Sequence, residues 1–216
     1  MHNKFFFGKF LCNLKDNLGT NSSEIGLALS LFSLVASTRA QTVIEIGRFK
    51  GLSTYALASA LRFIDEEMNT SPDIHCYRPD INYQIEMNCK ERKVISIDPH
   101  MQPEAEAIIK DNDLDKYVEF VHGKSETCSF MVQADIIFID GNHTYNAVSA
   151  DVAKYVSNYL KPGGYFILHD YYGWYKNGVN ESPIKKVCDE LLAQNKIEHL
   201  LIDTKFMSFM IFRKPL

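Results

Sequence analysis

Short apolar runs alternate with helical patterns along most of the chain. Continuous apolar runs predict strands that are covered on both faces, at residues 42–46, 94–97, 117–121, 135–139 and 164–168. Apolar positions at helical spacing predict helices at residues 24–38, 52–63, 103–111, 144–160 and 182–194. This alternation predicts right-handed βαβ units, and therefore a doubly wound, Rossmann-like α/β sheet.

The end of the chain breaks the alternation. Two strand-like runs, at residues 196–203 and 206–213, are separated only by Thr204 and Lys205. Because so short a link cannot hold a crossover helix, it predicts an antiparallel hairpin. We therefore expect a mostly parallel sheet that ends in a C-terminal antiparallel hairpin.

The pattern also suggests how the chain is organised. Residues 1–39 are expected to form an N-terminal helical segment that packs on the domain, covers its pocket or pairs subunits. Residues 40–216 are expected to form the Rossmann-like domain. An insertion at about residues 65–93 is polar, contains Pro72 and Pro79, and delays the second strand. It is either a surface excursion or a segment that faces the substrate.

Composition narrows the classes of function. A formal net charge of -4 argues against a general nucleic-acid binder, and no apolar run approaches the ~20 residues of a membrane-spanning helix. The five cysteines include no Cys-x-x-Cys pair, so we expect reduced thiols in a cytoplasmic protein. Lys9 interrupts the N-terminal apolar run, which argues against a signal peptide. Whether the protein forms a homo-oligomer stays an open question.

A glycine-framed turn follows the first predicted strand. Glu45 lies near the end of that strand, and Gly47 and Gly51 bracket the turn before the next helix. Glycines allow a tight turn and a close approach of a ligand to the helix N-terminus. The spacing is not the Gly-x-Gly-x-x-Gly dinucleotide fingerprint. A purely structural turn is the alternative.

Two further strand ends carry candidate ligand-binding residues. Asp98 ends the second predicted strand, where a carboxylate can accept hydrogen bonds from both ribose hydroxyls of a nucleoside. Gly123-Lys124-Ser125 follows the third strand but lacks the first glycine of a phosphate-binding loop, since position 118 is Val. Gly123, Ser125 and Glu126 instead suit a loop that lines the base.

Two carboxylates are expected at the reaction site. Asp140 and Asp170 end strands that we expect to be neighbours, with His169 directly before Asp170 and His143 shortly after Asp140. Oxygen ligands suit Mg²⁺, whereas a histidine ligand suits Mn²⁺ better. Asp140, His169 and Asp170 are therefore candidate metal ligands, and His143 or Asp140 is a candidate base. Alternatively, Asp140 caps a helix, His169 packs against its neighbours and His143 merely precedes a helix.

Aromatic residues cluster after the last parallel strand, at Tyr171, Tyr172, Trp174 and Tyr175. Aromatic faces suit a sugar ring or a planar acceptor at the entrance to a site. A loop packed over the final helix explains them equally well.

Taken together, these motifs resemble those of class I S-adenosylmethionine-dependent methyltransferases over roughly residues 40–213. Residues 138–145 (FIDGNHTY), 161–164 (KPGG) and 169–171 (HDY) look like the family of macrocin-type and sugar O-methyltransferases, to which proteins labelled cephalosporin hydroxylase are similar. The resemblance implies that Glu45, Gly47 and Gly51 surround the methionine part of the cofactor. It also implies Asp98 on the ribose and Ser125 near the adenine.

A similarity to metal-dependent O-methyltransferases, including the catechol type, implies Asp140 and Asp170 as metal ligands. It also implies that His143 stands where some relatives have a catalytic lysine. Two positions depart from the pattern: Tyr171 replaces an asparagine of the catechol type, and His169 replaces an acid of the antibiotic-type relatives.

The leading hypothesis is an S-adenosylmethionine-dependent O-methyltransferase that acts on a hydroxyl of a small acceptor, such as a sugar or natural product. Mg²⁺ or Mn²⁺ would lower the pKa of that hydroxyl. The alternatives are a metal-independent methyltransferase, an NAD-linked oxidoreductase and a non-catalytic cofactor-binding protein of the same fold.

Overall fold

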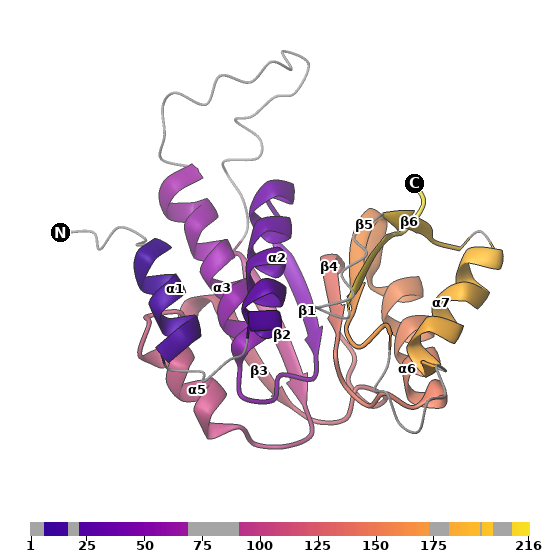
Figure 1. The fold of residues 1–216 in the computed structure, drawn as a ribbon, viewed down its shortest axis with the longest axis horizontal. Coiled ribbons are helices and arrows are strands. Elements are labelled where there is room, and N and C mark those ends of the chain that lie inside the picture. Colours follow the sequence, from indigo (N-terminus) through magenta and orange to yellow (C-terminus); the bar gives the residue numbers. More distant parts are fainter. Residues whose placement is uncertain (1–6, 17–21, 69–90, 173–181, 195, 201–208) are drawn as a thin grey trace, which may run out of the picture.

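A seven-stranded sheet forms the centre of the protein, whose computed structural model describes residues 7–16, 22–68, 91–172, 182–194, 196–200 and 209–216 (Figure 1). The strand order is β3-β2-β1-β4-β5-β7-β6. The strands are β1 Thr42–Ile46, β2 Lys93–Asp98, β3 Val118–His122, β4 Ala134–Ile139, β5 Leu160–Leu168, β6 Glu198–Leu200 and β7 Met210–Arg213.

The direction of the strands confirms the expected fold. Strands β1 to β5 pair in parallel, whereas β7 is antiparallel to both β5 and β6. The order reverses at β1, which lies between β2 and β4, so the sheet has a topological switch point there. The predicted link at Thr204 and Lys205 lies outside the described residues.

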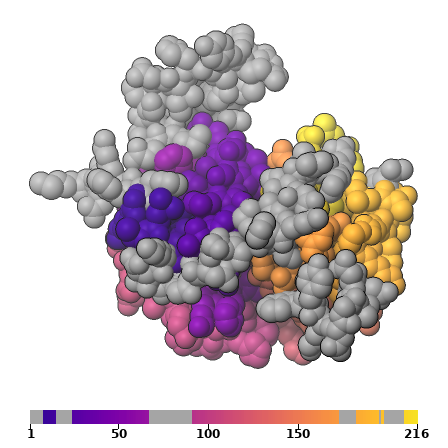
Figure 2. Space-filling model, in the orientation of Figure 1, coloured from indigo at the N-terminus to yellow at the C-terminus, as the bar shows by residue number. Residues whose placement is uncertain are grey.

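Helices cover both faces of the sheet. One face carries α1 Phe7–Asp16, α2 Ser22–Thr38, α3 Leu52–Phe63, η1 Ile64–Met68, α5 Pro103–Lys110 and η2 Asp115–Tyr117. The other carries α6 Tyr145–Asp151, η3 Val152–Val156 and α7 Pro183–Ala193. The two sets lie on opposite sides of the molecule in Figure 2, indigo to pink against orange to yellow. Alternate residues of β1 point into the two cores, with Val43 in one and Ile44 in the other.

Strand β5 begins earlier than its apolar pattern predicted. The prediction began at Gly164, but the strand begins at Leu160, which pairs with Ala134 of β4. A shift of register follows, so that Ile136 pairs with Tyr165. Gly163 lies in this irregular stretch with φ +75, a conformation that favours glycine. The predicted helix at 144–160 is formed as α6 and η3, and the helical stretch stops before Leu160, where β5 begins.

The N-terminal helix packs on the domain. In α1, Phe10 and Leu14 are buried in the same core as α2 and α3, and the Phe10 ring centroid lies 4.9 Å from that of Phe32. The Nδ2 of Asn13 donates to Oη of Tyr55 at 2.9 Å and to Oδ1 of Asn112 at 2.6 Å. None of the described helices is long and apolar enough to cross a membrane.

The insertion starts and ends at one place on the fold. Its described ends belong to η1 and to the approach to β2, and residues 69–90 lie outside the described part. The Nε of Arg92 lies 2.7 Å from Oδ1 of Asp65, and Nη1 of Arg92 donates to the carbonyl of Ala40 at 2.8 Å. Because η1 continues α3 and β2 follows directly, both ends lie at the amino-terminal edge of the parallel strands (Figure 1).

Candidate active site

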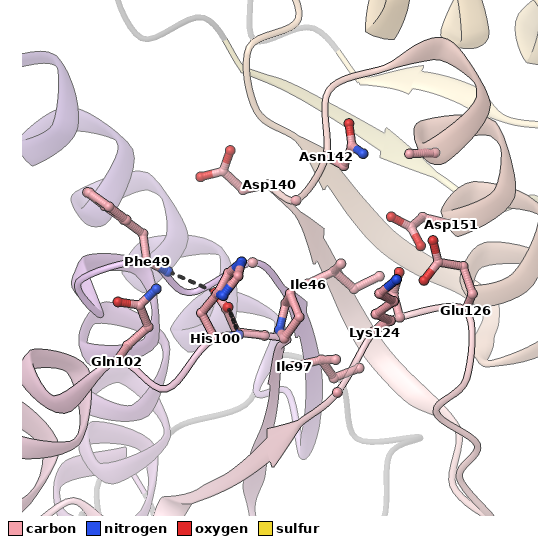
Figure 3. Close-up of a pocket in the computed structure, with 17 residues that line it drawn as sticks. Ile46, Phe49, Ile97, His100, Gln102, Lys124, Glu126, Asp140, Asn142 and Asp151 are labelled. Carbon is pink, nitrogen blue, oxygen red and sulfur yellow. Dashed lines mark hydrogen bonds between the residues drawn. The ribbon is translucent and has the colours of Figure 1, made fainter.

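A cavity of about 490 Å³ lies at the carboxyl ends of the parallel strands on both sides of the switch point (Figure 3). Open α/β sheets bind their ligands at this position. Six of the predicted ligand-binding residues line it: Gly47, Asp98, Gly123, Ser125, Glu126 and Asp140. Glu45 and Gly51 do not line it.

The two glycines of the turn after β1 have different structural roles. Gly47 has φ +85, and a Cβ there would lie 2.2 Å from the carbonyl oxygen of Asp140. Gly47 therefore lets the turns after β1 and β4 meet at the floor of the cavity. Gly51 has φ +88, and its Cβ would lie 2.7 Å from Cα of Ala105. Gly51 thus lets α3 pack against α5, one layer away from the cavity.

Glu45 lies beneath the start of α3. Its side chain is fully buried, and Oε2 accepts from Oγ1 of Thr54 at 2.6 Å and from Oγ of Ser96 at 2.5 Å. Oε1 has no hydrogen-bond partner among the described residues. Burial raises the pKa of Glu45 despite these hydrogen bonds. The carboxyl group therefore links β1, β2 and α3 under the turn.

Asp98 connects two loops that border the cavity. Its Oδ2 accepts from the backbone N–H of Arg48 at 3.1 Å, and its Oδ1 accepts from the backbone N–H of His100 at 2.8 Å. The carboxylate is largely buried but still lines the cavity. It can therefore hold the turn after β1 against the loop after β2 while it accepts a hydrogen bond from a ligand.

Arg48 is a buried cation that the sequence patterns did not identify. Its Nη1 donates to the carbonyl of Ser96 at 2.8 Å, its Nη2 lies 2.9 Å from Nδ1 of His122, and its guanidinium lies 5.0 Å from the ring centre of Phe120. Burial lowers the pKa of Arg48, and the charges of Asp98 and Glu45 oppose this. The side chain connects the carboxyl ends of β1, β2 and β3.

The loop after β3 is held from the side by the helical stretch after β4. The Nζ of Lys154 donates to the carbonyl of Ser125 at 2.7 Å, to that of Glu126 at 2.9 Å, and also to that of Cys128. The Oη of Tyr155 donates to the same Ser125 carbonyl at 2.7 Å. This loop wall of the cavity is therefore fixed by several direct hydrogen bonds.

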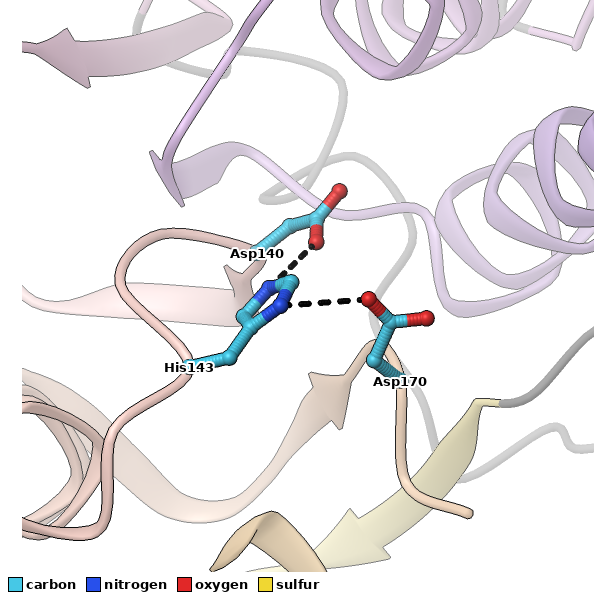
Figure 4. A group of neighbouring side chains, drawn as sticks. All are labelled: Asp140, His143 and Asp170. Atoms are coloured by element: carbon cyan, nitrogen blue, oxygen red, sulfur yellow. Dashed lines mark hydrogen bonds and ion pairs between the residues drawn. The ribbon is translucent and has the colours of Figure 1, made fainter. Parts of the chain in front are cut away.

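The predicted reaction site is assembled at the ends of β4 and β5 (Figure 4). The Nε2 of His143 lies 3.1 Å from Oδ1 of Asp140, and its Nδ1 lies 3.1 Å from Oδ2 of Asp170. The Nδ1 of His169 lies 3.0 Å from Oδ1 of Asp140. Asp170 has φ +52, a conformation that aspartate tolerates better than most residues. Two carboxylates thus flank one imidazole.

The electrostatics of this cluster follow from its contacts. Burial alone would raise the pKa of Asp140, but hydrogen bonds and charge from His143 and His169 outweigh it and lower that pKa. The hydrogen bond to Asp140 is the main cause that raises the pKa of His143. Burial would lower the pKa of His169, but its contact with Asp140 prevails and raises it. The contacts therefore favour an ionised Asp140 beside protonated imidazoles of His143 and His169.

The cluster that could hold a metal differs from the predicted set by one histidine. Ligand atoms of Asp140, His143 and Asp170 all lie within 4.8 Å of one another. The sequence suggested His169 in place of His143, because His169 is adjacent to Asp170 in the chain. His169 instead contacts Asp140, and its Nδ1 is 3.7 Å from Oδ1 of Asp170.

Other residues at the cavity escaped the sequence patterns. Phe49, His100, Gln102, Asn142 and Asp151 all line it. The first four lie within four residues of the end of a strand, and this position could have identified them from the sequence. Asp151 reaches the cavity from the end of α6, which no strand end indicates.

Only part of the aromatic cluster is described. Tyr171 is buried, with its ring centroid 5.0 Å from that of Tyr172 and 6.3 Å from that of Phe212. It therefore packs against the core. Trp174 and Tyr175 lie outside the described residues.

Comparison with known families matches residues 44–171 to the family described as methyltransferase domain. The match covers more than half of the chain and includes the turn after β1, the cavity and the His143 cluster. The chain belongs to this methyltransferase family, and the prediction of a methyltransferase is confirmed. No curated protein matches the sequence.

Solved structures show the same fold at low sequence identity. The SAH-bound methyltransferase PaMTH1 of Podospora anserina has a TM-score of 0.66 and 14% identity, covering 96% of this chain and 86% of its own. An O-methyltransferase of Bacillus cereus in complex with SAH has a TM-score of 0.65 and 16% identity, covering 95% and 90%. TomG is an O-methyltransferase of Streptomyces achromogenes involved in tomaymycin synthesis and was solved with SAM. It has a TM-score of 0.62 and 14% identity, covering 96% of this chain and 88% of its own. These likenesses support the class I methyltransferase fold.

Proposed function

We propose that the protein transfers the methyl group of S-adenosylmethionine to a hydroxyl of a small acceptor, such as a sugar or another natural product. The observation that carries the proposal is the cavity at the switch point of a methyltransferase-family sheet, next to the His143 cluster. S-adenosylmethionine is the donor that fits, since relatives of the same fold bind SAM or SAH.

The cavity has suitable groups for such a donor. Gly47 keeps the floor free of side chains where the methionine part would lie, and Asp98 can accept from ribose hydroxyls. Ser125 and Glu126 belong to the loop that would face the base. Asp140 lines the cavity and also belongs to the His143 cluster, so the donor's methyl group would lie next to that cluster.

The His143 cluster has a donor set that suits a divalent cation. Two carboxylate oxygens and one imidazole nitrogen within 4.8 Å match the ligands that Mn²⁺ accepts, and Mg²⁺ would use the two carboxylates. A cation bound there would lower the pKa of the acceptor hydroxyl and make it a better nucleophile. Asp140, Asp170 and an imidazole would hold it, while the protein orients the acceptor oxygen toward the methyl group.

A metal-independent methyltransferase is the second candidate, favoured by the two carboxylates beside His143. In this reaction the acceptor oxygen forms a bond to the methyl carbon as the carbon–sulfur bond breaks. Neutral His143 would accept the hydroxyl proton, and the resulting imidazolium would donate to Asp140 and Asp170. The raised pKa of His143 makes it a stronger base.

Calorimetry with separate ligands tests the proposal. S-adenosylmethionine and NAD are titrated into the protein with Mg²⁺, with Mn²⁺ and with a chelator. We expect binding of the methyl donor and no binding of NAD; tighter binding of NAD would refute the proposal. Turnover of hydroxylated acceptors that persists in chelator would select the metal-independent reaction.

The remaining assignments rest on the sequence. The narrower likeness to macrocin-type and sugar O-methyltransferases is carried by motifs such as residues 161–164. It favours a glycosidic or polyhydroxylated acceptor. The formal net charge of -4 fits a small acceptor better than a nucleic acid, and a cytoplasmic location and a homo-oligomer stay predictions.

A further inference from the structure

An arginine in the turn after β1 contacts a histidine at the end of β3. The side chain of Arg48 is 1% exposed, and its Nη2 lies 2.9 Å from Nδ1 of His122. A guanidinium has only donors and keeps its proton, so the imidazole nitrogen must accept this hydrogen bond. His122 is therefore neutral in this arrangement, with its proton on Nε2.

The guanidinium of Arg48 depends on this contact, because its other acceptors are few. Its Nη1 donates to the carbonyl of Ser96 at 2.8 Å and to that of Val121 at 3.4 Å. Its Nε has no hydrogen-bond partner among the described residues. Loss of His122 as an acceptor would add another unmet donor to a buried charge, which is costly.

His122 has a second partner that prefers it charged. Its Nε2 lies 3.5 Å from Oε1 of Glu106 on α5. The two side chains are 38% and 41% exposed, so water can supply a proton. The carboxylate of Asp98, on the neighbouring β2, is engaged by the backbone of Arg48 and His100. Arg48 therefore favours neutral His122, whereas Glu106 favours its imidazolium.

Protonation of His122 would break its contact with Arg48. An imidazolium carries a proton on both ring nitrogens, so Nδ1 could no longer accept, and two positive charges would lie 2.9 Å apart. The negative charges of Asp98, Glu45 and Glu106 act on Arg48 and favour its charged form. The imidazole is therefore the member of the pair that changes its charge.

Arg48 is also anchored in the turn that shapes the cavity. Its N–H donates to Oδ2 of Asp98 at 3.1 Å, and its carbonyl accepts from the N–H of Gly51 at 2.7 Å. Its two neighbours in the chain, Gly47 and Phe49, line the cavity. Phe49 has φ +41, a strained conformation that persists only when its surroundings hold it. The position of Arg48 therefore sets the position of the cavity wall.

We propose that Arg48 and His122 form a proton-sensitive latch on the turn after β1. Neutral His122 holds the turn in the shape that binds the methyl donor, whereas protonated His122 releases Arg48 and pairs with Glu106. This inference rests on the proposed function, which places S-adenosylmethionine in the cavity. Neither member of the latch lines the cavity, so both are positioning residues.

Nuclear magnetic resonance of the wild-type protein in chelator, without donor, tests the latch itself. Long-range proton–nitrogen spectra report which ring nitrogens of His122 are protonated. We expect the Nε2–H form at about pH 8 and the imidazolium at about pH 5.5, since these values bracket the usual titration range of imidazole. The amide resonances of Gly47 and Arg48 should shift together with His122. Amides that do not follow His122 would overturn the latch.

Calorimetry with S-adenosylhomocysteine at the same two pH values tests its effect on the donor. We expect wild type to bind about fivefold or more weakly at the lower pH. His122→Asn supplies an oxygen near the position of Nδ1 that accepts from Arg48 and does not titrate. This variant should keep the wild-type affinity at the higher pH and lose most of the weakening. His122→Leu removes the acceptor and should bind weakly at both pH values.

A pair of variants on α5 tests the second partner of His122. Glu106→Gln removes the charge that favours the imidazolium, so the weakening at the lower pH should be smaller than in wild type. Glu104→Gln makes the same change at an exposed position of the same helix and should behave as wild type. Thermal melting at both pH values checks that each variant is folded.

The outcomes separate the latch from the proposed function. His143 and His169 remain in every variant, so an equal weakening in wild type and His122→Asn would assign it to other groups and overturn the latch. If wild type binds neither S-adenosylmethionine nor S-adenosylhomocysteine at either pH, the proposed function fails. The amide shifts of Gly47 and Arg48 then still decide whether His122 controls the turn.

Discussion

The Nδ1 of His143 lies 3.1 Å from Oδ2 of Asp170, although the two residues follow different strands of the sheet. Since β4 and β5 are parallel neighbours, their carboxyl ends place these side chains at the same edge. The contact joins the turn after β4 to the turn after β5, and with Asp140 it defines the reaction site.

Replacing Asp170 by Asn should remove binding of a divalent cation while leaving the donor site intact. An amide is a much weaker ligand than a carboxylate, and Asn tolerates the φ of +52 at this position. We expect Mn²⁺ affinity, measured by calorimetry, to fall about tenfold or more. Affinity for S-adenosylmethionine should change less than about twofold, because Asp170 does not line the cavity.

Turnover of Asp170→Asn then decides between the two candidate mechanisms. Loss of metal-stimulated turnover supports metal assistance. Wild-type turnover in the variant would contradict any role of this cluster in catalysis.

Protonation of His143 should stabilise the metal-free fold. Its pKa is raised in the folded protein, chiefly by the hydrogen bond to Asp140. The stabilisation is fully present below the ordinary imidazole pKa of about 6.5, and is lost as the pH rises through the raised folded value. In chelator, the difference in unfolding free energy between wild type and His143→Asn should therefore shrink as pH increases. A difference independent of pH would show that the pKa of His143 is not raised.

Replacing Gly47 by Ala should damage both stability and donor binding. The new Cβ would meet the Asp140 carbonyl at 2.2 Å, and φ is +85. We expect a loss of about 2 kcal/mol or more in unfolding free energy, because the obstructing atoms are backbone. Gly8→Ala is the matched control, since nothing lies within 4 Å of its Cβ on α1. Gly8→Ala should raise the free energy of unfolding slightly, by up to about 1 kcal/mol, because alanine has a higher helix propensity than glycine.

Replacing Asp98 by Asn should loosen two loops at once. Asn has one acceptor oxygen, so its amide nitrogen would face the N–H of either Arg48 or His100. We expect a loss of about 1–3 kcal/mol in unfolding free energy, measured by urea denaturation, together with weaker donor binding. Asp113→Asn serves as the comparison, since Asp113 is exposed with φ +54, which Asn tolerates. Equal stability of both variants would contradict the role given to Asp98.

The fold could be predicted from the sequence because its signals are local. The apolar run of β1 has the predicted bounds, and so does α3. The start of β5 could not be read in this way, since it depends on a shift of register against β4 around Gly163. The sequence of residues 161–164, Lys-Pro-Gly-Gly, favours a turn by its local propensity. Pairing with β4 outweighs this propensity, so the segment belongs to β5.

The site was predictable to the extent that strand ends meet at one edge. Asp98, Asp140 and Asp170 were expected there for this reason, and the structure brings them to that edge. Glu45 faces α3 with Val43 and not the cavity, because strand residues alternate between faces, so its expected place near the methionine part of the cofactor stays a prediction. The positions of Asp151 and Arg48 at the site depend on partners from other elements, such as His122 for Arg48. The local sequence pattern does not indicate these contacts.

The ion pair between Asp65 and Arg92 joins the two ends of the insertion at the edge of the sheet away from the cavity. This ion pair holds η1 beside the start of β2, and neither of its residues lines the donor pocket. A reporter label attached beside Asp65 or Arg92 would therefore follow the domain without entering the pocket.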